Sequence, residues 1–344
     1  MSAIEVKNLS RSYGDIDAVK DVSFTVPEKS FTVLLGPSGC GKSTILKMLS
    51  GLEQVSHGTI NIGGSDVTEI EASKRGVSMV FQSYALFPHL NVKENIQFGL
   101  KVRKVPVEER EKKVAEAAKV VGLTELLDRK PANLSGGQRQ RVALARSIVS
   151  EQSVCLMDEP LSNLDSKLRA EMRDEIRDLQ KRLGLTVVYV THDQVEAMSM
   201  ADQIILLRLG EIVQVGAPEE IYNSPNSVFS AQFIGLPPMN VLNLKEIDTS
   251  TLDSKIKPAL ESSNIKNIGI RPEHLIFSKK GLPVIVKSID YFGGETVFKL
   301  THQEKDFFLR EPRQPKIQLG DKLCVSWNLD DMYLFDKNDQ RLKS

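Results

Sequence analysis

The stretch Gly36-Pro37-Ser38-Gly39-Cys40-Gly41-Lys42-Ser43-Thr44 fits the phosphate-loop pattern G-x-x-x-x-G-K-[ST]. An apolar, β-rich run at 31–35 enters this loop, and a helical pattern that starts near Lys42 leaves it. Closely spaced glycines let backbone N–H groups converge on phosphate oxygens, and the start of the helix adds a favourable dipole. Lys42 is expected to contact the β- and γ-phosphates, and Ser43 to bind Mg²⁺ through its hydroxyl. The sequence therefore predicts an α/β fold with a site for a nucleoside triphosphate and Mg²⁺.

Two carboxylates follow a second buried-strand pattern, at 154–157. Consecutive strand residues point to opposite faces, so Asp158 and Glu159 are expected to have different roles. Asp158 is predicted to hold Mg²⁺ through water, and Glu159 to face the γ-phosphate as the general base that polarises the attacking water. Alone, an acidic pair at a strand end is more often the start of a solvated loop. The phosphate loop upstream reverses that preference.

Two single polar residues follow further strand patterns. Gln82 comes after the strand predicted at 77–81, and His192 after the one at 187–190. Ligands of parallel sheets collect at the carboxyl ends of the strands. Gln82 is therefore predicted to reach Mg²⁺ and the attacking water, and His192 the γ-phosphate, although a lone Gln or His in such a place is usually structural.

The run Leu134-Ser135-Gly136-Gly137-Gln138 precedes a helix predicted at 139–149. Ser135 and Gln138 have capping-box spacing, so a good helix start is the simplest interpretation. That interpretation leaves two consecutive glycines unexplained. They expose backbone N–H groups at the positive end of a helix, which predicts a second anion site that one phosphate loop does not need.

With these motifs in this order, the chain resembles the ABC ATPase family, whose signature is LSGGQ, from residue 4 to about residue 235. The resemblance implies a P-loop NTPase fold, in which a RecA-like core carries an antiparallel β subdomain and a helical subdomain. It also implies further roles: adenine stacking for Tyr13, the Q-loop for Gln82, the D-loop for Ser162-Asn163-Leu164-Asp165 and the switch position for His192.

In this family two cassettes pack head to tail, with each ATP held between the phosphate loop of one chain and the signature of the other. The resemblance thus implies a homodimer, or a heterodimer with a related chain. Across that interface Ser135, Gly136, Gly137, Gln138 and Asp165 would contribute to the partner's ATP site.

Strand and helix patterns divide the chain into two predicted domains. Residues 1–235 alternate strands with helices, which favours a mostly parallel sheet, with a helical insertion at about 91–150. A linker, GLPPMN at 235–240, leads to residues 236–344, where short strands predict a small all-β barrel or sandwich. The linker and Gly269–His274 resemble parts of the OB-like TOBE domain.

The segment 80–90, VFQSYALFPHL, resembles the docking segment of sugar-importer ATPases. The resemblance implies two membrane-spanning permease subunits that dock near Gln82–Leu90 and an extracytoplasmic solute-binding protein that acts indirectly. It places the chain, as a peripheral protein, on the cytoplasmic face of the inner membrane. Two alternatives stay open: another cargo, such as ferric ion, a polyamine or sulfate, and a soluble ABC ATPase that acts on ribosomes or DNA.

The composition of the chain bears on nucleic-acid binding, on the redox compartment and on membrane spanning. Of 344 residues, 45 Lys and Arg balance 45 Asp and Glu, so the basic excess of a nucleic-acid-binding protein is absent. Three distant cysteines favour a reducing compartment over a disulfide scaffold. No apolar run approaches the ~18–20 residues that span a bilayer, so other chains are expected to cross the membrane.

Overall fold

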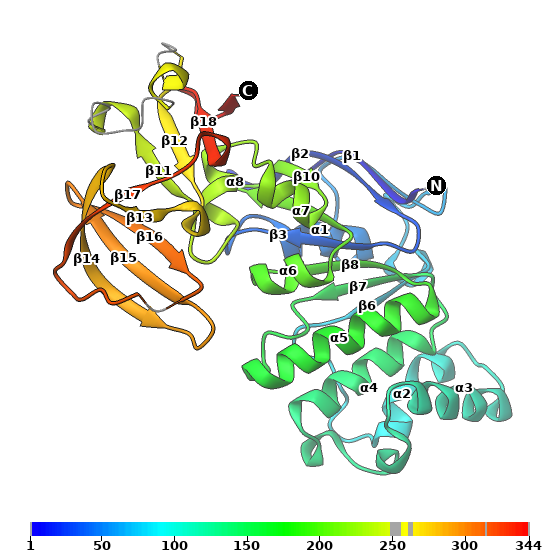
Figure 1. Cartoon of the computed structure of the whole chain (residues 1–344). Helices are drawn as coiled ribbons and strands as arrows, with labels where there is room; N and C mark the ends of the chain where they lie inside the picture. The colour runs from blue at the N-terminus through cyan, green and yellow to red at the C-terminus, as the bar shows by residue number, and fades with distance from the viewer. Residues whose placement is uncertain (1, 248–255, 261–263, 314, 343–344) are drawn as a thin grey trace. The chain divides into compact units, whose positions relative to one another are not determined.

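The computed structural model describes residues 2–247, 256–260, 264–313 and 315–342 (Figure 1). It divides into two compact units, one up to Pro218 and one from Glu219 onward. The division therefore falls before the predicted domain boundary at 235, and the segment between the two positions packs with the second unit. Each unit is described by itself below.

The larger sheet of the first unit has six strands in the order β10-β9-β3-β8-β7-β6. All neighbours are parallel except β9 and β10, which confirms the expected mostly parallel α/β sheet. Most of its residues are fully buried, as is typical of strands covered on both faces. The strands are β3 (Phe31–Leu35), β6 (Val77–Val80), β7 (Val154–Asp158), β8 (Thr186–Thr191), β9 (Gln203–Arg208) and β10 (Glu211–Gly216).

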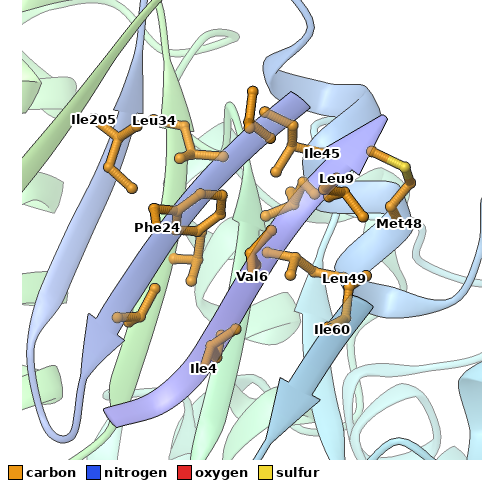
Figure 2. Close-up of a cluster of buried hydrophobic side chains, with 14 of the residues drawn as sticks. Ile4, Val6, Leu9, Phe24, Leu34, Ile45, Met48, Leu49, Ile60 and Ile205 are labelled. Carbon is orange, nitrogen blue, oxygen red and sulfur yellow. The ribbon is translucent and has the colours of Figure 1, made fainter. Parts of the chain in front are cut away.

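A smaller antiparallel sheet, in the order β2-β1-β4-β5, supplies the other wall of the main core. Its strands are β1 (Ser2–Tyr13), β2 (Ile16–Pro27), β4 (His57–Ile62) and β5 (Ser65–Asp66). Figure 2 shows side chains of this sheet meeting those of β3, β9 and helix α1 (Lys42–Ser50). Ile4, Leu9, Leu34, Ile45 and Ile205 are all fully buried in this cluster. Each such side chain contributes roughly 1.5–3 kcal/mol through burial, so the cluster anchors α1 firmly behind the phosphate loop.

Three helices form the block predicted at 91–150: α2 (Val92–Val102), α3 (Val107–Val120) and α4 (Gly136–Ile148). Their starts follow local sequence rules. Asn91 and Glu94 form a reciprocal capping box at the start of α2, and Glu108 and Glu109 lie in the positive first turn of α3. In Figure 1 this block lies beside α5 (Ser166–Leu183), whose buried face carries Met172, Ile176 and Leu179.

The second unit is built on two antiparallel sheets, as expected for a small all-β domain. One has the order β11-β12-β18-β19, with β11 (Asn240–Asn243), β12 (Asn267–Ile270), β18 (Met332–Phe335) and β19 (Arg341–Leu342). The other has the order β13-β17-β14-β15-β16, with β13 (Ile276–Ser278), β14 (Leu282–Tyr291), β15 (Thr296–His302), β16 (Lys305–Glu311) and β17 (Lys322–Ser326). Their inner faces share one hydrophobic core.

A fully buried arginine explains why 219–235 packs with the second unit. Arg271 follows β12 and is 0% exposed. Its guanidinium donates hydrogen bonds to the carbonyls of Tyr222, Ala231 and Ile234 and lies 3.9 Å from the centre of the Tyr222 ring. The short helices α7 (Pro218–Asn223) and α8 (Val228–Phe233) are thereby tied to the sheet that the sequence placed in the next domain.

Several short elements were not predicted, namely α6 (Gln194–Met200), α7, α8, β11, β13, β18 and β19. Each is too short to show a hydrophobic period. Among the described residues, no helix combines the length and the apolar character that crossing a membrane requires.

Candidate functional site

The carboxyl ends of four neighbouring parallel strands meet at one edge of the larger sheet. The register pairs Leu35 of β3 with Thr191 of β8, and Asp158 of β7 with Val190 of β8, while β6 runs parallel on the other side of β7. The phosphate loop, Gln82, the acidic pair and His192 follow these strands directly. The sheet therefore brings residues far apart in the sequence to one edge, as expected.

The phosphate loop requires glycine for steric reasons. A Cβ atom on Gly36 would lie 2.3 Å from the carbonyl oxygen of Leu207, and one on Gly41 would lie 2.5 Å from that of Ala18. Gly41 has φ +99° and is the N-cap of α1, with no side-chain hydrogen bond to the first turn. Of the other residues in the loop, Pro37, Ser43 and Thr44 are half-buried and Ser38 is exposed. The helix start thus presents backbone donors, which suits an anion.

Lys42 points back into its own loop. Its side chain is 5% exposed, and Nζ donates to the carbonyl oxygens of Gly36 at 2.8 Å and Pro37 at 2.9 Å. Cys40 Sγ lies 3.7 Å from the same nitrogen. Burial raises the pKa of the Cys40 thiol, and the nearby ammonium only partly offsets this effect. The loop therefore concentrates positive charge without a reactive thiolate at neutral pH.

Ser43 and Asp158 form a pair of oxygen ligands. Ser43 Oγ donates to Asp158 Oδ1 at 2.9 Å. Burial raises the pKa of the Asp158 carboxyl, and the Ser43 hydrogen bond opposes this. Hydroxyl and carboxylate oxygens side by side are the ligands that Mg²⁺ prefers, usually together with water and substrate phosphates. Among the described residues, no three His, Cys, Asp or Glu side chains gather into a cage, so the pair fits an ion that arrives with a nucleotide.

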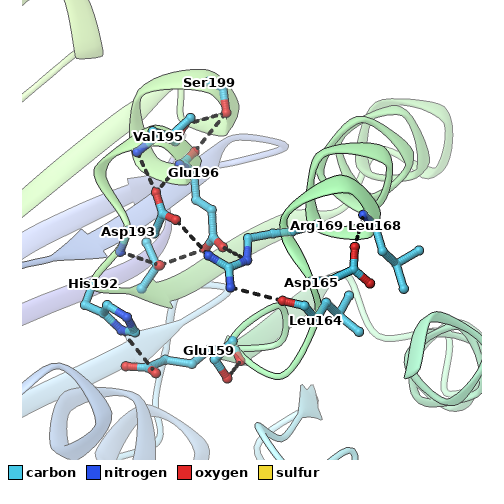
Figure 3. Close-up of polar contacts among 12 residues, drawn as sticks. Glu159, Leu164, Asp165, Leu168, Arg169, His192, Asp193, Val195, Glu196 and Ser199 are labelled. Carbon is cyan, nitrogen blue, oxygen red and sulfur yellow. Dashed lines mark hydrogen bonds and ion pairs between the residues drawn. The ribbon is translucent and has the colours of Figure 1, made fainter. Parts of the chain in front are cut away.

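Glu159 and His192 face each other across the strand ends, as Figure 3 shows. His192 Nδ1 lies 3.3 Å from Glu159 Oε2. Glu159 has a left-handed backbone, with φ +42°. Its N–H donates to Val190, and its carbonyl accepts from the Ser162 N–H and hydroxyl. The backbone of Glu159 is therefore held through both its N–H and its carbonyl group, while its carboxylate points toward His192.

Gln82 is exposed and lies against the D-loop. Its Nε2 donates to Ser162 Oγ at 3.3 Å, and its carbonyl accepts from Asn163 Nδ2 at 3.0 Å. The structure thus brings the predicted Q-loop and D-loop together. The role of Gln82 as an Mg²⁺ ligand stays a prediction.

Tyr13 ends β1 and is 45% exposed. It pairs with Ile16 across a tight turn, and the Arg11 guanidinium carbon lies 4.6 Å from the centre of its ring. An exposed aromatic ring can stack on a base, so the adenine prediction fits this position. Asp165 is the N-cap of α5, where its Oδ1 accepts from the Leu168 N–H.

The signature run begins α4 with the predicted capping box. Ser135 Oγ accepts from the Gln138 N–H at 3.3 Å, and Gln138 Oε1 accepts from the Ser135 N–H at 2.9 Å. The two glycines have a packing role that the sequence did not suggest. A Cβ on Gly136 would lie 2.8 Å from Leu164 Cδ2, and one on Gly137 would lie 3.1 Å from Leu168 Cδ1. The two glycines therefore allow close packing against Leu164 and Leu168, and a larger residue would need these leucine side chains to shift.

Two residues outside the predicted set hold the segment 80–90. Asn95 is fully buried, and its amide bonds to the backbone of Phe87, Leu90 and Asn91. Arg146 of α4 donates to the Ala85 carbonyl and lies over the Phe87 ring. Nothing in the spacing of these two residues signals such a contact.

The chain is similar to known proteins over its whole length. The family model for ABC transporters matches residues 19–162, and the model for the TOBE domain matches residues 268–335. The maltose/maltodextrin import ATP-binding protein MalK of Vibrio vulnificus is 42% identical, and the match covers 100% of this chain and 97% of that protein. The sn-glycerol-3-phosphate import ATP-binding protein UgpC of Brucella abortus is 43% identical, with 99% of each chain covered.

A solved structure is similar to part of the chain. The protein cbiO1 of Clostridium perfringens, part of the ABC transporter complex cbiONQ, superimposes with a TM-score of 0.59 and 30% identity. The match covers 64% of this chain and 90% of that one.

Proposed function

The chain belongs to the ATP-binding proteins of ABC transporters, and we propose that its ATP hydrolysis powers the import of a sugar or sugar-like solute. The observation that carries the proposal is the meeting of Lys42, the Ser43–Asp158 pair and the Glu159–His192 pair at one sheet edge. These residues supply a phosphate-binding cation, oxygen ligands for Mg²⁺ and a base beside an orienting imidazole. Hydrolysis of a triphosphate needs those three functions.

Each residue at this edge has a proposed role. Lys42 and the N–H groups of the phosphate loop bind the phosphates, and Tyr13 stacks on adenine. Ser43 holds Mg²⁺ directly, Asp158 holds it through water, and Gln82 completes the set; the ion neutralises phosphate charge. Glu159 accepts a proton from the attacking water. His192, 3.3 Å from Glu159, orients this carboxylate and contacts the γ-phosphate.

The second anion site supports a head-to-tail homodimer. Ser135 and the backbone N–H groups of Gly136 and Gly137 lie at the start of α4, in the helical block rather than at the four strand ends. In the proposed dimer they contact the γ-phosphate bound by the partner, with Gln138 and Asp165 beside them. Each chain then completes the other's site.

The relatives favour a sugar or a sugar-like solute as the cargo. They are import proteins for maltose or maltodextrin and for sn-glycerol-3-phosphate, and both match this chain over nearly its full length. Ferric ion, polyamine or sulfate cargo is correspondingly disfavoured, as is a non-transport role. The proposed partners are two permease subunits that dock at 82–90 and, indirectly, a solute-binding protein. The chain itself would lie at the cytoplasmic face of the membrane, with 236–344 as its TOBE domain.

The test uses the purified full chain. Wild type is expected to hydrolyse Mg²⁺-ATP, whereas Glu159→Gln binds ATP without hydrolysis and accumulates as a dimer measurable by light scattering. Lys42→Ala is the matched control, since it is expected to bind no ATP and to stay monomeric. Absence of hydrolysis by the wild type, or an E159Q variant that ignores ATP, contradicts the proposal. Cargo is tested separately, by solute uptake into cells that lack the gene and carry either wild type or E159Q.

A further inference from the structure

Arg169 lies one turn into α5 and connects two parts of the site, as Figure 3 shows. Its Nη2 donates to the carbonyl oxygen of Leu164 at 3.1 Å. Its Nη1 donates to Asp193 Oδ2 at 3.2 Å, and its Nε lies 4.0 Å from Glu196 Oε1. One guanidinium thus spans the D-loop and the segment that follows β8.

The first end of this connection reaches the signature run. Leu164 precedes Asp165 and is 6% exposed, and its side chain lies against Gly136, as the 2.8 Å approach to a Cβ built there shows. The Leu164 carbonyl that Arg169 holds therefore belongs to the residue on which the signature packs. The signature and Arg169 thus contact the same residue, one through its side chain and the other through its carbonyl.

The second end reaches the two residues that flank His192 in the chain, Thr191 and Asp193. Asp193 follows His192 directly and caps α6 by accepting from the N–H groups of Val195 and Glu196. The Asp193 N–H donates to Thr191 Oγ1, and the Thr191 hydroxyl donates to the buried Glu196 carboxylate. The residues on both sides of His192 are therefore fixed to a cluster that includes Arg169.

The chemistry of the cluster requires a guanidinium. Burial raises the pKa of the Glu196 carboxyl, and Asp193 adds a second negative charge nearby. Arg169 supplies positive charge to both carboxylates while it bonds a carbonyl on its other side. A planar group whose N–H donors lie on several atoms fits acceptors on opposite sides, whereas the ammonium of lysine carries all its donors on one atom.

From this arrangement we propose that Arg169 is a positioning residue that couples the signature run of a chain to the His192 of the same chain. The inference rests on the proposed function, because in the head-to-tail dimer the signature contacts the partner's ATP while His192 contacts the chain's own. The Leu164–Arg169–Asp193 connection then runs between the two ATP sites. Closure of the signature on one ATP sets the position of His192 at the other.

The test compares two arginines of the same helix. Arg169→Ala is expected to lower kcat by about 10- to 100-fold, as misplacement of catalytic groups does, while the Kd for a fluorescent ATP analogue changes less than about threefold. The Hill coefficient for ATP is expected to fall to 1. Arg177→Ala is the matched control, since Arg177 lies two turns further along α5 and bonds Gln180 of the same helix and Asp202, which precedes β9. It is expected to lose stability and keep the wild-type Hill coefficient.

Two further variants separate positioning from folding. Arg169→Lys keeps the charge and is expected to recover stability but not the Hill coefficient. Asp193→Asn keeps the α6 cap. Combined with R169A, it is expected to lower kcat little further, because both substitutions remove the same Arg169–Asp193 interaction. Wild-type kcat and Hill coefficient in R169A, or equal losses in R169A and R177A, overturn the inference. A wild type without ATPase activity would instead contradict the proposed function.

Discussion

The Ser43 hydroxyl donates a 2.9 Å hydrogen bond to the Asp158 carboxylate and so joins the first turn of α1 to the end of β7, 115 positions later. Burial raises the pKa of the Asp158 carboxyl, with the Glu159 charge as a further cause. The folded chain therefore holds this proton more tightly than the unfolded chain does. The contribution of Asp158 to stability is complete below its ordinary pKa and declines as the pH rises through the raised value.

Asp158→Asn is accordingly expected to stabilise the nucleotide-free chain at pH 7, by about 1 kcal/mol, and to abolish Mg²⁺-dependent ATPase activity. Asparagine keeps an acceptor for Ser43 but carries no buried charge. Urea unfolding at pH 7 and at pH 4 measures the effect, and the gain should shrink at the lower pH. An equal gain at both pH values would show that the charge is not its cause.

The phosphate loop offers a matched pair of glycine substitutions. Gly36→Ala would place a methyl group 2.3 Å from the Leu207 carbonyl oxygen, whereas a Cβ on Gly39 meets no atom within 4 Å. Gly39 still has a left-handed φ of +80°. We expect G39A to lower the free energy of unfolding by about 1 kcal/mol and G36A by about 3 kcal/mol. Chemical denaturation of both variants checks the order, and equal losses would argue against the close approach of β9.

The buried amide of Asn95 is one of the two groups that hold the segment 80–90. Asn95→Ala removes the partner of three backbone carbonyls and of the Phe87 N–H, so we expect a loss of about 3 kcal/mol. Hydrogen exchange in 84–91 should accelerate more than exchange in β3. Asn133→Ala, at an exposed position of the same helical block, serves as the control and should change neither. Unchanged protection of 84–91 in N95A would contradict the assigned role.

The second unit depends on Arg271 in a similar way. Arg271→Met leaves the carbonyls of Tyr222, Ala231 and Ile234 without their donor, at a cost of about 3 kcal/mol. Hydrogen exchange should rise in α7 and α8, while ATP binding persists because every proposed ligand lies in the first unit. Arg271→Lys should recover less than half of the stability, since one ammonium cannot replace the three carbonyl contacts and the stacking on Tyr222. Full recovery in R271K would show that charge alone matters.

Local sequence was enough to propose the parts of the candidate site that are built from consecutive residues. In the phosphate loop, the acidic pair and the signature, a few consecutive residues supply both the backbone conformation and the side chains that the proposed chemistry requires. The sheet then follows from apolar runs such as 31–35 and 187–190, whose shared edge aligns Gln82, Glu159 and His192.

What the sequence did not suggest depends on contacts between distant segments. In the sequence, Arg169 is one of several arginines on a predicted helix. No neighbouring residue indicates that its side chain bonds Asp193. The packing of Gly136 on Leu164 and the grip of Arg271 on α8 are likewise set by tertiary approach. The boundary between the two units lies before residue 235 because Arg271 bonds α7 and α8 to the second unit. The composition of the linker, proline and glycine, does not indicate with which unit the preceding residues pack.

Helix α4 connects the signature to the segment 84–87 as one rigid element. Its 13 residues make a rod about 20 Å long. Ser135 caps one end, and near the other Arg146 grips Ala85, which with Tyr84 has a left-handed backbone. Such a conformation is strained for residues other than glycine and persists only while a neighbour holds it. If a permease docks at 84–87 as proposed, α4 would connect the docking segment to the signature through one rigid element, and relaxation of Tyr84 and Ala85 would break that connection at the Arg146–Ala85 bond.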